Sequence, residues 1–348
     1  MAAIGAGILL ALLLFAPVVQ FTDANDYNIQ RVDPASGLPL YYPHTVVHEL
    51  TGCFENDAWI NNLGFHGPDV QLQKSPGVFR IVVVGSSYVE ARQVPTEQMF
   101  TTLLQQKLNA DPHKKYTYEV IPIGFNGNST LLNDLYYTYY GSPLKPDLVI
   151  DMESGYELLL HLDAAPLDQS GHAILAVPPP PRDSIARELL RHSKLLVDIY
   201  NRLLVFKSAS MSFLQRPLFF MPAPAALAPA DAIKAEAERW SIKNPLIDSM
   251  AELIRADHTK LLFATFVGGV GEPEGTEAEL SKHFTQLAAK DNFAYDNLAP
   301  FIRASESSTG KSFTWLPCDG HFSPAGHQFV ADALYTYLSE HPALITAQ

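Results

Sequence analysis

The stretch that constrains the fold most is residues 79–85, FRIVVVG, which two serines follow directly. Its apolar residues are continuous and do not alternate with polar ones, which is typical of a parallel strand covered on both faces. Gly85 then allows a tight turn and a close approach of the backbone. Open α/β sheets place their ligands at the carboxyl ends of such strands, so Ser86 and Ser87 lie where a ligand is expected.

Three further apolar runs repeat this pattern along the chain. They predict strands at 118–123, 147–152 and 260–267, with helical patterns between them. This alternation favours a mostly parallel sheet with helices on both faces, which is a three-layer α/β/α sandwich of the flavodoxin-like kind. Each strand ends in a turn rich in Gly, Asn or Ser, so we expect these loops to gather at one edge of the sheet.

Several helices are predicted from capping residues and amphipathic spacing. Thr96 and Glu97 are expected to form the cap and first turn of a helix that follows the serine turn. Amphipathic helices are predicted near 231–256 and 276–290, and a last helix is expected to begin just after Pro324.

Composition suggests how the chain divides into parts. Residues 22–78 are rich in turn residues, and we interpret them as an extended arm laid over the main domain. The main domain is expected to span 79–345, and an insertion at about 158–232 interrupts its alternation of strands and helices. Residues 1–21 form a separate hydrophobic segment.

Residues 2–19 are the only stretch of membrane length, at the lower limit of what spans a bilayer as a helix. No Lys or Arg precedes Arg31, so the positively charged start of a standard signal peptide is missing. We interpret residues 1–21 as a signal peptide or transmembrane anchor, with a buried core helix as the alternative. The remaining chain is then expected to be extracytoplasmic, in the cell envelope, and either secreted or bound to the membrane through residues 2–19.

Charge and motifs exclude several classes of function. The 348 residues carry 37 acids against 24 bases, with a formal net charge of −13 and no basic run, which argues against a nucleic-acid partner. His44, His48 and Glu49 form H-x-x-x-H-E, which is not the H-E-x-x-H order of a zinc protease, so no metal is expected. Neither glycine-rich turn has the lysine of a nucleotide-binding loop, so no cofactor is expected either.

The serine turn and a late Asp-Gly-His together resemble a known family. The block GSSYVEARQV around Ser87, residues 126–130 (NGNST) and residues 319–327 (DGHFSPAGH) are similar to the conserved blocks of the SGNH (GDSL-type) hydrolases, in the branch whose last block reads D-G-H-W-[NS]-P-x-G-H. The resemblance covers about residues 60 to 340, apart from the insertion. It implies the SGNH version of the three-layer fold.

Carried over by position, the resemblance makes Ser87 the nucleophile, His321 its general base and Asp319 the residue that orients His321. The chemistry supports these roles, because a serine hydroxyl needs a neutral imidazole to take its proton and an acceptor to hold that imidazole in one tautomer. The family also implies that the N–H groups of Ser87 and Gly127 form the oxyanion hole. We interpret His327 as a helix or packing residue and not as a second base.

Two departures from the family pattern affect the expected activity. Ser86 stands where the family has aspartate, and residues 154–157 (SGYE) stand where it has G-N-D, so the asparagine donor of the oxyanion hole is missing. Tyr156, Ser154 or a nearby Asn could replace that donor, or activity is weak or lost.

Glu153 and Glu157 also suggest the paired carboxylates of a glycosidase, but the sequence does not show how far apart the two carboxyl groups lie in space.

The leading hypothesis is therefore an extracytoplasmic serine esterase or acyl hydrolase, or an enzyme of acyl or acetyl transfer. Its substrate would be a small ester, a lipid or an acylated glycan. The alternative is a weak or inactive envelope protein of the same fold that binds a glycan or a protein partner.

The chain has two cysteines, Cys53 and Cys318. An extracytoplasmic compartment permits a disulfide, and we predict one between them, which would tie the lead-in to the first strand to the loop that carries Asp319 and His321. Two buried free thiols are the alternative.

Overall fold

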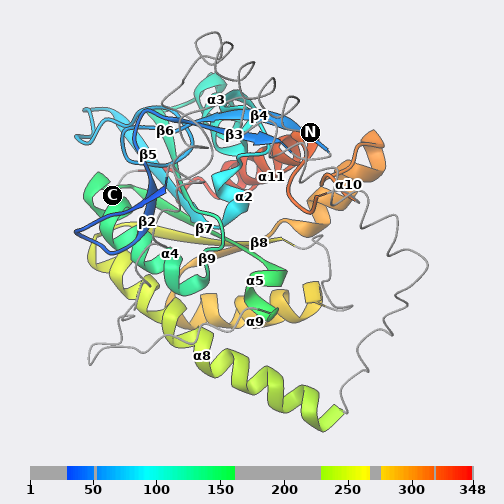
Figure 1. Ribbon diagram of the computed structural model, residues 1–348. Helices are drawn as coiled ribbons and strands as arrows, with labels where there is room; N and C mark the ends of the chain where they lie inside the picture. The colour runs from blue at the N-terminus through cyan, green and yellow to red at the C-terminus, as the bar shows by residue number, and fades with distance from the viewer. Residues whose placement is uncertain (1–29, 51–52, 161–228, 267–275, 317–318, 347–348) are drawn as a thin grey trace, which may run out of the picture.

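The computed structural model describes residues 30–50, 53–160, 229–266, 276–316 and 319–346 (Figure 1). At its centre lies a five-stranded sheet with the strand order β6-β5-β7-β8-β9, in which every neighbouring pair is parallel. The predicted α/β class with a parallel sheet is confirmed. The strands are β5 (Val78–Gly85), β6 (Thr117–Gly124), β7 (Leu148–Ser154), β8 (Lys260–Phe266) and β9 (Ala294–Asn297).

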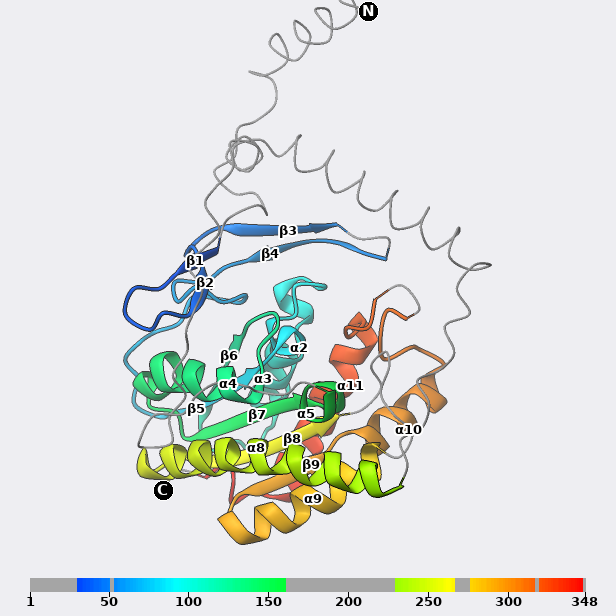
Figure 2. The same ribbon diagram turned by 60° about the horizontal axis from the view of Figure 1, so that its bottom comes forward.

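Helices cover both faces of this sheet (Figures 1 and 2). One face packs against α3, α10 and α11, and the other packs against α4, α8 and α9. The helical elements are α2 (Ser87–Glu90), η1 (Thr96–Gln98), α3 (Phe100–Ala110), α4 (Thr130–Tyr136), η2 (Tyr137–Gly141), η3 (Ser142–Leu144), α5 (Gly155–Leu160), α8 (Pro229–Ala256), α9 (Thr276–Asp291), α10 (Ala299–Thr309) and α11 (Pro324–Glu340).

Alternate residues of β5 enter opposite layers, which explains its continuous apolar run. Phe79, Ile81 and Val83 pack in the cluster that contains α3 and α11. Val82 and Val84 pack in the cluster that contains α4 and the end of α8. All five side chains are 0% exposed. Because helices cover both faces of the strand, neither face is exposed to solvent, and the sequence does not alternate between apolar and polar residues.

The N-terminal arm is more regular than predicted. It contains two antiparallel two-stranded sheets, β1–β2 and β3–β4, in place of an extended chain. Leu40, Val47, Ala58 and Phe65 are at most 1% exposed and join the same hydrophobic cluster as Val82. The arm is thus packed onto the α/β core. Its strands are β1 (Gln30–Val32), β2 (Pro39–Tyr41), β3 (Val46–Leu50) and β4 (Glu55–Trp59).

The predicted start of the helix after the serine turn is wrong. Thr96 begins only the short turn η1, and α3 begins at Phe100. The Thr96 hydroxyl lies 3.2 Å from Nε2 of His66, so it is not used as a helix cap. The Phe100 N–H instead donates to Nδ1 of His327 at 3.2 Å. The structure agrees with the interpretation of His327 as a helix and packing residue, because burial lowers its pKa to about 3 and keeps the imidazole neutral.

Two sequence predictions fall wholly or largely outside the described residues. The hydrophobic segment 2–19 is one of them, and most of the insertion at 158–232 is the other. Within the described ranges, no helix combines the length and apolar character that a membrane crossing needs.

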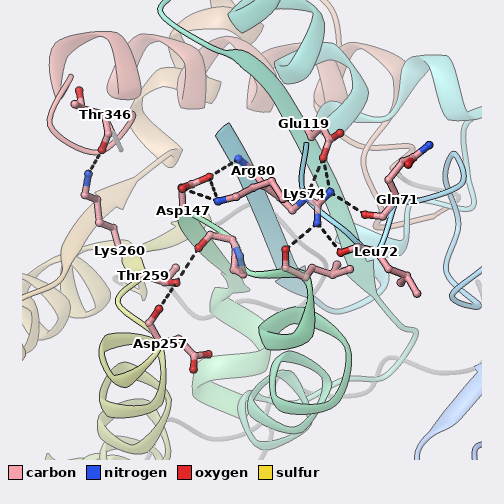
Figure 3. A network of polar contacts seen from close by, with 12 residues as sticks. Gln71, Leu72, Lys74, Arg80, Glu119, Asp147, Asp257, Thr259, Lys260 and Thr346 are labelled. Carbon is pink, nitrogen blue, oxygen red and sulfur yellow. Dashed lines mark hydrogen bonds and ion pairs between the residues drawn. The ribbon is translucent and has the colours of Figure 1, made fainter. Parts of the chain in front are cut away.

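A buried arginine ties the amino ends of the strands together (Figure 3). Arg80 is 0% exposed, and its guanidinium donates to Glu119 at 2.9 Å and to the carbonyl oxygens of Leu144 and Gln71 at 2.8 Å each. The Arg80 backbone N–H donates to the Asp147 carboxylate at 2.8 Å. This network lies at the opposite end of β5 from the serine turn, so we infer that it stabilises the fold and takes no part in the chemistry of the site.

We expect Arg80→Met to lower the free energy of unfolding by about 3 kcal/mol or more, because it leaves buried carbonyl groups and one carboxylate without their donor. Lys74→Met is the matched control. Lys74 also donates to Asp147, at 2.8 Å, but its side chain is 26% exposed, so its loss is expected to cost about 1 kcal/mol or less. Urea unfolding at pH 7 measures both, and equal losses would contradict the assignment.

Candidate active site

The serine turn is built by close packing around two glycines. A Cβ atom on Gly85 would lie 2.4 Å from Cγ2 of Val89 and 2.8 Å from the carbonyl oxygen of Met152, so the strand end admits only glycine. A Cβ on Gly124, at the end of β6, would lie 2.2 Å from the backbone nitrogen of Glu90. Ser87 is the first residue of α2 and projects from the carboxyl edge of the sheet, as the sequence predicted.

Ser87, His321 and Asp319 come together although 232 residues separate the serine from the aspartate. Nε2 of His321 lies 2.8 Å from Oγ of Ser87, and Nδ1 lies 2.7 Å from Oδ1 of Asp319. The same carboxylate oxygen accepts the His321 backbone N–H at 2.8 Å. Burial opposes ionisation of Asp319, but the hydrogen bonds from His321 outweigh it and hold the pKa of Asp319 below its usual value.

Backbone pairing on either side of Asp319 and His321 holds the loop that carries these two residues. Thr314 and Phe322 form a β-bridge, and the Trp315 N–H donates to the His321 carbonyl oxygen at 3.0 Å. Tyr88 packs against this loop, with its ring centroid 5.1 Å from that of His321, and its hydroxyl donates to the Gly320 carbonyl oxygen at 3.3 Å. The residue after the nucleophile therefore helps to fix the position of the base.

The predicted oxyanion donors are free to bind. Gly127 has φ +79° and occupies the third position of a turn that the Asn128 N–H closes on the Phe125 carbonyl oxygen at 3.1 Å. A Cβ atom on Gly127 would meet nothing within 4 Å, so this backbone faces open space. Within the described part of the chain, neither the Ser87 N–H nor the Gly127 N–H has an acceptor.

The replacements proposed for the missing asparagine donor are mostly engaged elsewhere. Ser154 and Glu157 form a capping box on α5, in which the Ser154 N–H donates to the Glu157 carboxylate at 2.8 Å and the Glu157 N–H to the Ser154 hydroxyl at 3.1 Å. The Asn128 amide donates to the Gly85 carbonyl oxygen at 3.2 Å and to Asn133 at 3.3 Å. The Tyr156 side chain is outside the described set, so its predicted role stays a prediction.

Behind the site lies a cluster of buried carboxyl groups on β7 and α5. Asp151 and Glu153 are each 1% exposed and accept hydrogen bonds from the Asn133 amide at 3.2 and 3.0 Å. Burial raises the pKa of Asp151 well above its usual value, and it also raises the pKa of Glu157. Because these carboxyls bond internally, they do not form the paired acid and base of a glycosidase.

The raised pKa of Asp151 has a defined effect on stability. In the unfolded chain the Asp151 carboxyl loses its proton near pH 3.9, whereas in the folded protein it keeps that proton to a higher pH. The contribution of this carboxyl to the free energy of unfolding is therefore complete below about pH 3.9 and is lost as the pH rises through the folded pKa. We expect Asp151→Asn, which keeps an acceptor for Asn133, to gain free energy of unfolding relative to wild type as the pH rises, by up to about 1.4 kcal/mol per pH unit.

Urea unfolding at pH 5, 6 and 7 checks this difference. A flat difference for Asp151→Asn would show that its carboxyl ionises normally in the folded protein.

Sequence reasoning missed a group of polar residues that meets behind α2. Tyr41, Glu90 and His66 are each 1% exposed, and Glu90 is hydrogen-bonded by both of the others. Arg92 contacts Glu90 at 3.2 Å. The signal that could have found them is the acidic and basic pair, E-A-R, in the same block as the serine.

Cys53 lies beside the loop of the dyad. Its Sγ is 4.0 Å from the carbonyl oxygen of Trp315, and the ring of the next residue, Phe54, is 5.7 Å from the Trp315 ring. Cys318 is outside the described residues, so the Cys53–Cys318 disulfide stays a prediction.

His44 and His48, the pair weighed for zinc, contact different carboxylates. Nδ1 of His48 lies 2.6 Å from Oδ1 of Asp57, whereas His44 is exposed and lies 3.6 Å from Asp69. The described residues contain no group of three or more His, Cys, Asp or Glu side chains placed to hold a metal ion.

Fold and site together define an α/β sandwich protein that carries a Ser-His-Asp triad at the carboxyl edge of a parallel sheet. No protein-family model matches the sequence, and a comparison with curated proteins finds no match.

Solved structures do match. A lipase/acylhydrolase from Enterococcus faecalis is 13% identical, with a TM-score of 0.42, over 76% of this chain and 96% of its own. A catalytic mutant of an acetylxylan esterase from Geobacillus stearothermophilus is 12% identical, with a TM-score of 0.40, over 76% and 94%. A psychrotrophic esterase from a Pseudoalteromonas species is 12% identical, with a TM-score of 0.39, over 76% and 98%. The structural neighbours are thus SGNH/GDSL esterases and acylhydrolases at low identity.

Proposed function

We propose that the protein is a serine esterase or acyl hydrolase that works through an acyl-enzyme on Ser87. One observation carries the proposal, namely the continuous chain of hydrogen bonds from Ser87 Oγ through His321 to Asp319, at 2.8 and 2.7 Å. A serine that only packs at a strand end has no need of an imidazole held in this way by a carboxylate.

In the proposed reaction, Ser87 Oγ attacks the ester carbonyl carbon while Nε2 of His321 takes the hydroxyl proton. The carbonyl oxygen becomes an oxyanion, which the N–H groups of Ser87 and Gly127 stabilise. His321 then gives its proton to the leaving alcohol as the C–O bond breaks. Water, or a second alcohol in a transfer reaction, then loses its proton to His321 and attacks the acyl carbon. The bond from that carbon to Ser87 Oγ breaks, and His321 returns the proton to Oγ, which releases the acid or the new ester and restores Ser87.

The proposal extends to substrate and location. The substrate is an ester-containing small molecule, a lipid or an acylated glycan. We also propose that the protein works in the cell envelope, secreted or anchored through residues 2–19; the length and apolar character of that segment support this location.

A second function is favoured by one observation. Ser154 and Asn128 already use their polar groups inside the protein, so the third oxyanion donor of the family is not replaced by either of them. Loss of one such donor typically lowers the rate by about 10²–10³-fold. A weak or inactive envelope protein that binds a glycan or a protein in the same place is therefore the alternative.

Labelling with a serine-directed fluorophosphonate tests the proposal. We expect one covalent adduct, which peptide mapping places on Ser87 and not on Ser86, together with hydrolysis of p-nitrophenyl acetate. Ser86 is 2% exposed, and its hydroxyl makes no hydrogen bond to His321. A folded wild-type protein that neither forms the adduct nor hydrolyses the ester would support the binding function.

A further inference from the structure

The helix that presents the nucleophile cannot hold its own shape. The α2 helix has four residues, and the Ala91 N–H closes it on the carbonyl oxygen of Ser87 at 2.9 Å. A single helical turn is unstable in isolation because its nucleation is unfavourable. Ala91 also has φ +55° and ψ +37°, a left-handed conformation that costs a residue with a Cβ about 1–2 kcal/mol. Contacts from elsewhere must therefore hold this turn.

Two buried side chains of the N-terminal arm hold Glu90. The Tyr41 hydroxyl donates to Oε1 of Glu90 at 2.7 Å, and Nδ1 of His66 donates to the Glu90 carbonyl oxygen at 2.8 Å. Burial lowers the pKa of His66 to about 4, so its ring is neutral and carries one N–H. With that N–H directed at Glu90, Nε2 is the acceptor for the Thr96 hydroxyl.

The hairpin β3–β4 holds the next part of the turn. Glu49 and Asn56 lie directly opposite each other across the hairpin, and both reach Arg92. The Asn56 amide donates to the Arg92 carbonyl oxygen at 2.8 Å, and Oε2 of Glu49 lies 3.4 Å from Nε of Arg92. Figure 2 shows the hairpin on the same side of the sheet as α2.

Glu49 also lies within electrostatic reach of the dyad. Burial raises the pKa of its carboxyl, Arg92 lowers it, and smaller effects come from His321, which lowers it, and from Glu90 and Asp319, which raise it. Phe54, just before β4, also has its ring 5.7 Å from the Trp315 ring, so the hairpin lies against both the turn after Ser87 and the loop that carries His321.

We propose that Tyr41, Glu49, Asn56 and His66 are positioning residues that set the place of Ser87 by holding the 90–92 turn; this inference rests on the proposed function. The Ser87 carbonyl oxygen accepts the bond that ends at Ala91, so a shift of the turn is passed to Ser87. Misplacing a reacting group by about 1 Å lowers a rate by about 10²-fold. The arm is then part of the catalytic apparatus although it supplies no reacting atom.

The test compares two buried tyrosines that each donate one hydrogen bond. Tyr41→Phe removes the bond to Glu90, and Tyr136→Phe removes a bond of 2.5 Å to the Pro39 carbonyl oxygen in the same arm. With both variants folded well below their melting temperatures, we expect fluorophosphonate labelling of Ser87 to slow by about 10–100-fold in Tyr41→Phe. Tyr136→Phe should stay within about twofold of wild type. Equal rates in the two variants would overturn the proposal.

Rescue at Ala91 separates positioning from a general loss of stability. Glycine adopts the left-handed conformation without the Cβ penalty, so Ala91→Gly should restore part of the labelling rate in the Tyr41→Phe background. The same change in the Tyr136→Phe background should have little effect. A double variant as slow as Tyr41→Phe alone would contradict the claim that the arm holds this turn.

A spectroscopic measurement keeps the inference separate from the proposed function. In protein with 15N-labelled histidine, we expect the signals of the His321 ring to shift in Tyr41→Phe and to stay in place in Tyr136→Phe, because Nε2 loses its contact with Ser87 only in the first. If wild type does not react with the reagent, the proposed function fails and this comparison still decides the positioning role. Unchanged His321 signals in Tyr41→Phe would refute it.

Discussion

Ser87→Ala is expected to lower kcat for p-nitrophenyl acetate by about 10⁶-fold and to abolish the fluorophosphonate adduct. The change removes the hydroxyl oxygen that is hydrogen-bonded to Nε2 of His321, so the imidazole loses the nucleophile that it would activate. The backbone N–H groups of residues 87 and 127 remain in place. Any residual rate would therefore come from binding and oxyanion stabilisation alone.

Ser86→Ala is the matched control. Ser86 is the N-cap of α2, but its side chain makes no capping hydrogen bond, so the helix is not expected to lose stability through this change. We expect Ser86→Ala to keep the adduct and to stay within about tenfold of the wild-type rate, an effect small beside the loss of the nucleophile. An inert Ser86→Ala protein together with an active Ser87→Ala protein would transfer the nucleophile to residue 86.

Asp319→Asn is expected to lower kcat by about 10⁴-fold while leaving the fold intact. The Asp319 carboxylate accepts hydrogen bonds from both Nδ1 and the backbone N–H of His321. An amide that turns its NH₂ group toward Nδ1 stabilises the other tautomer, which places a proton on Nε2 and leaves no acceptor for Ser87. The acylation rate, measured as a pre-steady-state burst, should fall with kcat.

Asp296→Asn serves as the comparison for Asp319→Asn. Asp296 is a partly buried carboxyl on β9, and burial raises its pKa to about 6, but it makes no hydrogen bond to the triad. It should keep wild-type activity. If Asp319→Asn stayed within about tenfold of wild type, the aspartate would not orient His321, since loss of that role typically costs about 10⁴-fold.

The strands that the sequence predicted are those buried on both faces. β5, β6, β7 and β8 all lie within two residues of the predicted bounds, because a strand covered by two helical layers is mostly apolar and gives a nearly continuous apolar run in the sequence. β9 (AYDN) was missed, since it has four residues and all of them are only partly buried. The arm's hairpins were missed because their short strands lie between Pro and Gly turns.

The residues of the triad were also found from the sequence, because the blocks around Ser87 and around Asp319 and His321 resemble those of the SGNH hydrolases. That Ser87 and His321 meet at 2.8 Å was decided by the tertiary fold, which places β5 between β6 and β7 and brings the loop before α11 to the carboxyl edge of the sheet. Thr96 was assigned wrongly as a helix cap because its partner, His66, lies 30 residues away in the chain.

Local sequence therefore determined which residues can carry the chemistry, because a strand, a glycine turn and an Asp-Gly-His are set by neighbours along the chain. Tertiary structure alone decided what holds those residues in place. Tyr41, Glu49 and His66 act on a turn more than 20 residues away, and Arg80 and Asp151 are polar side chains buried within strands. Such groups are stable only where distant partners supply their hydrogen bonds, and the partners become visible only when the chain is folded.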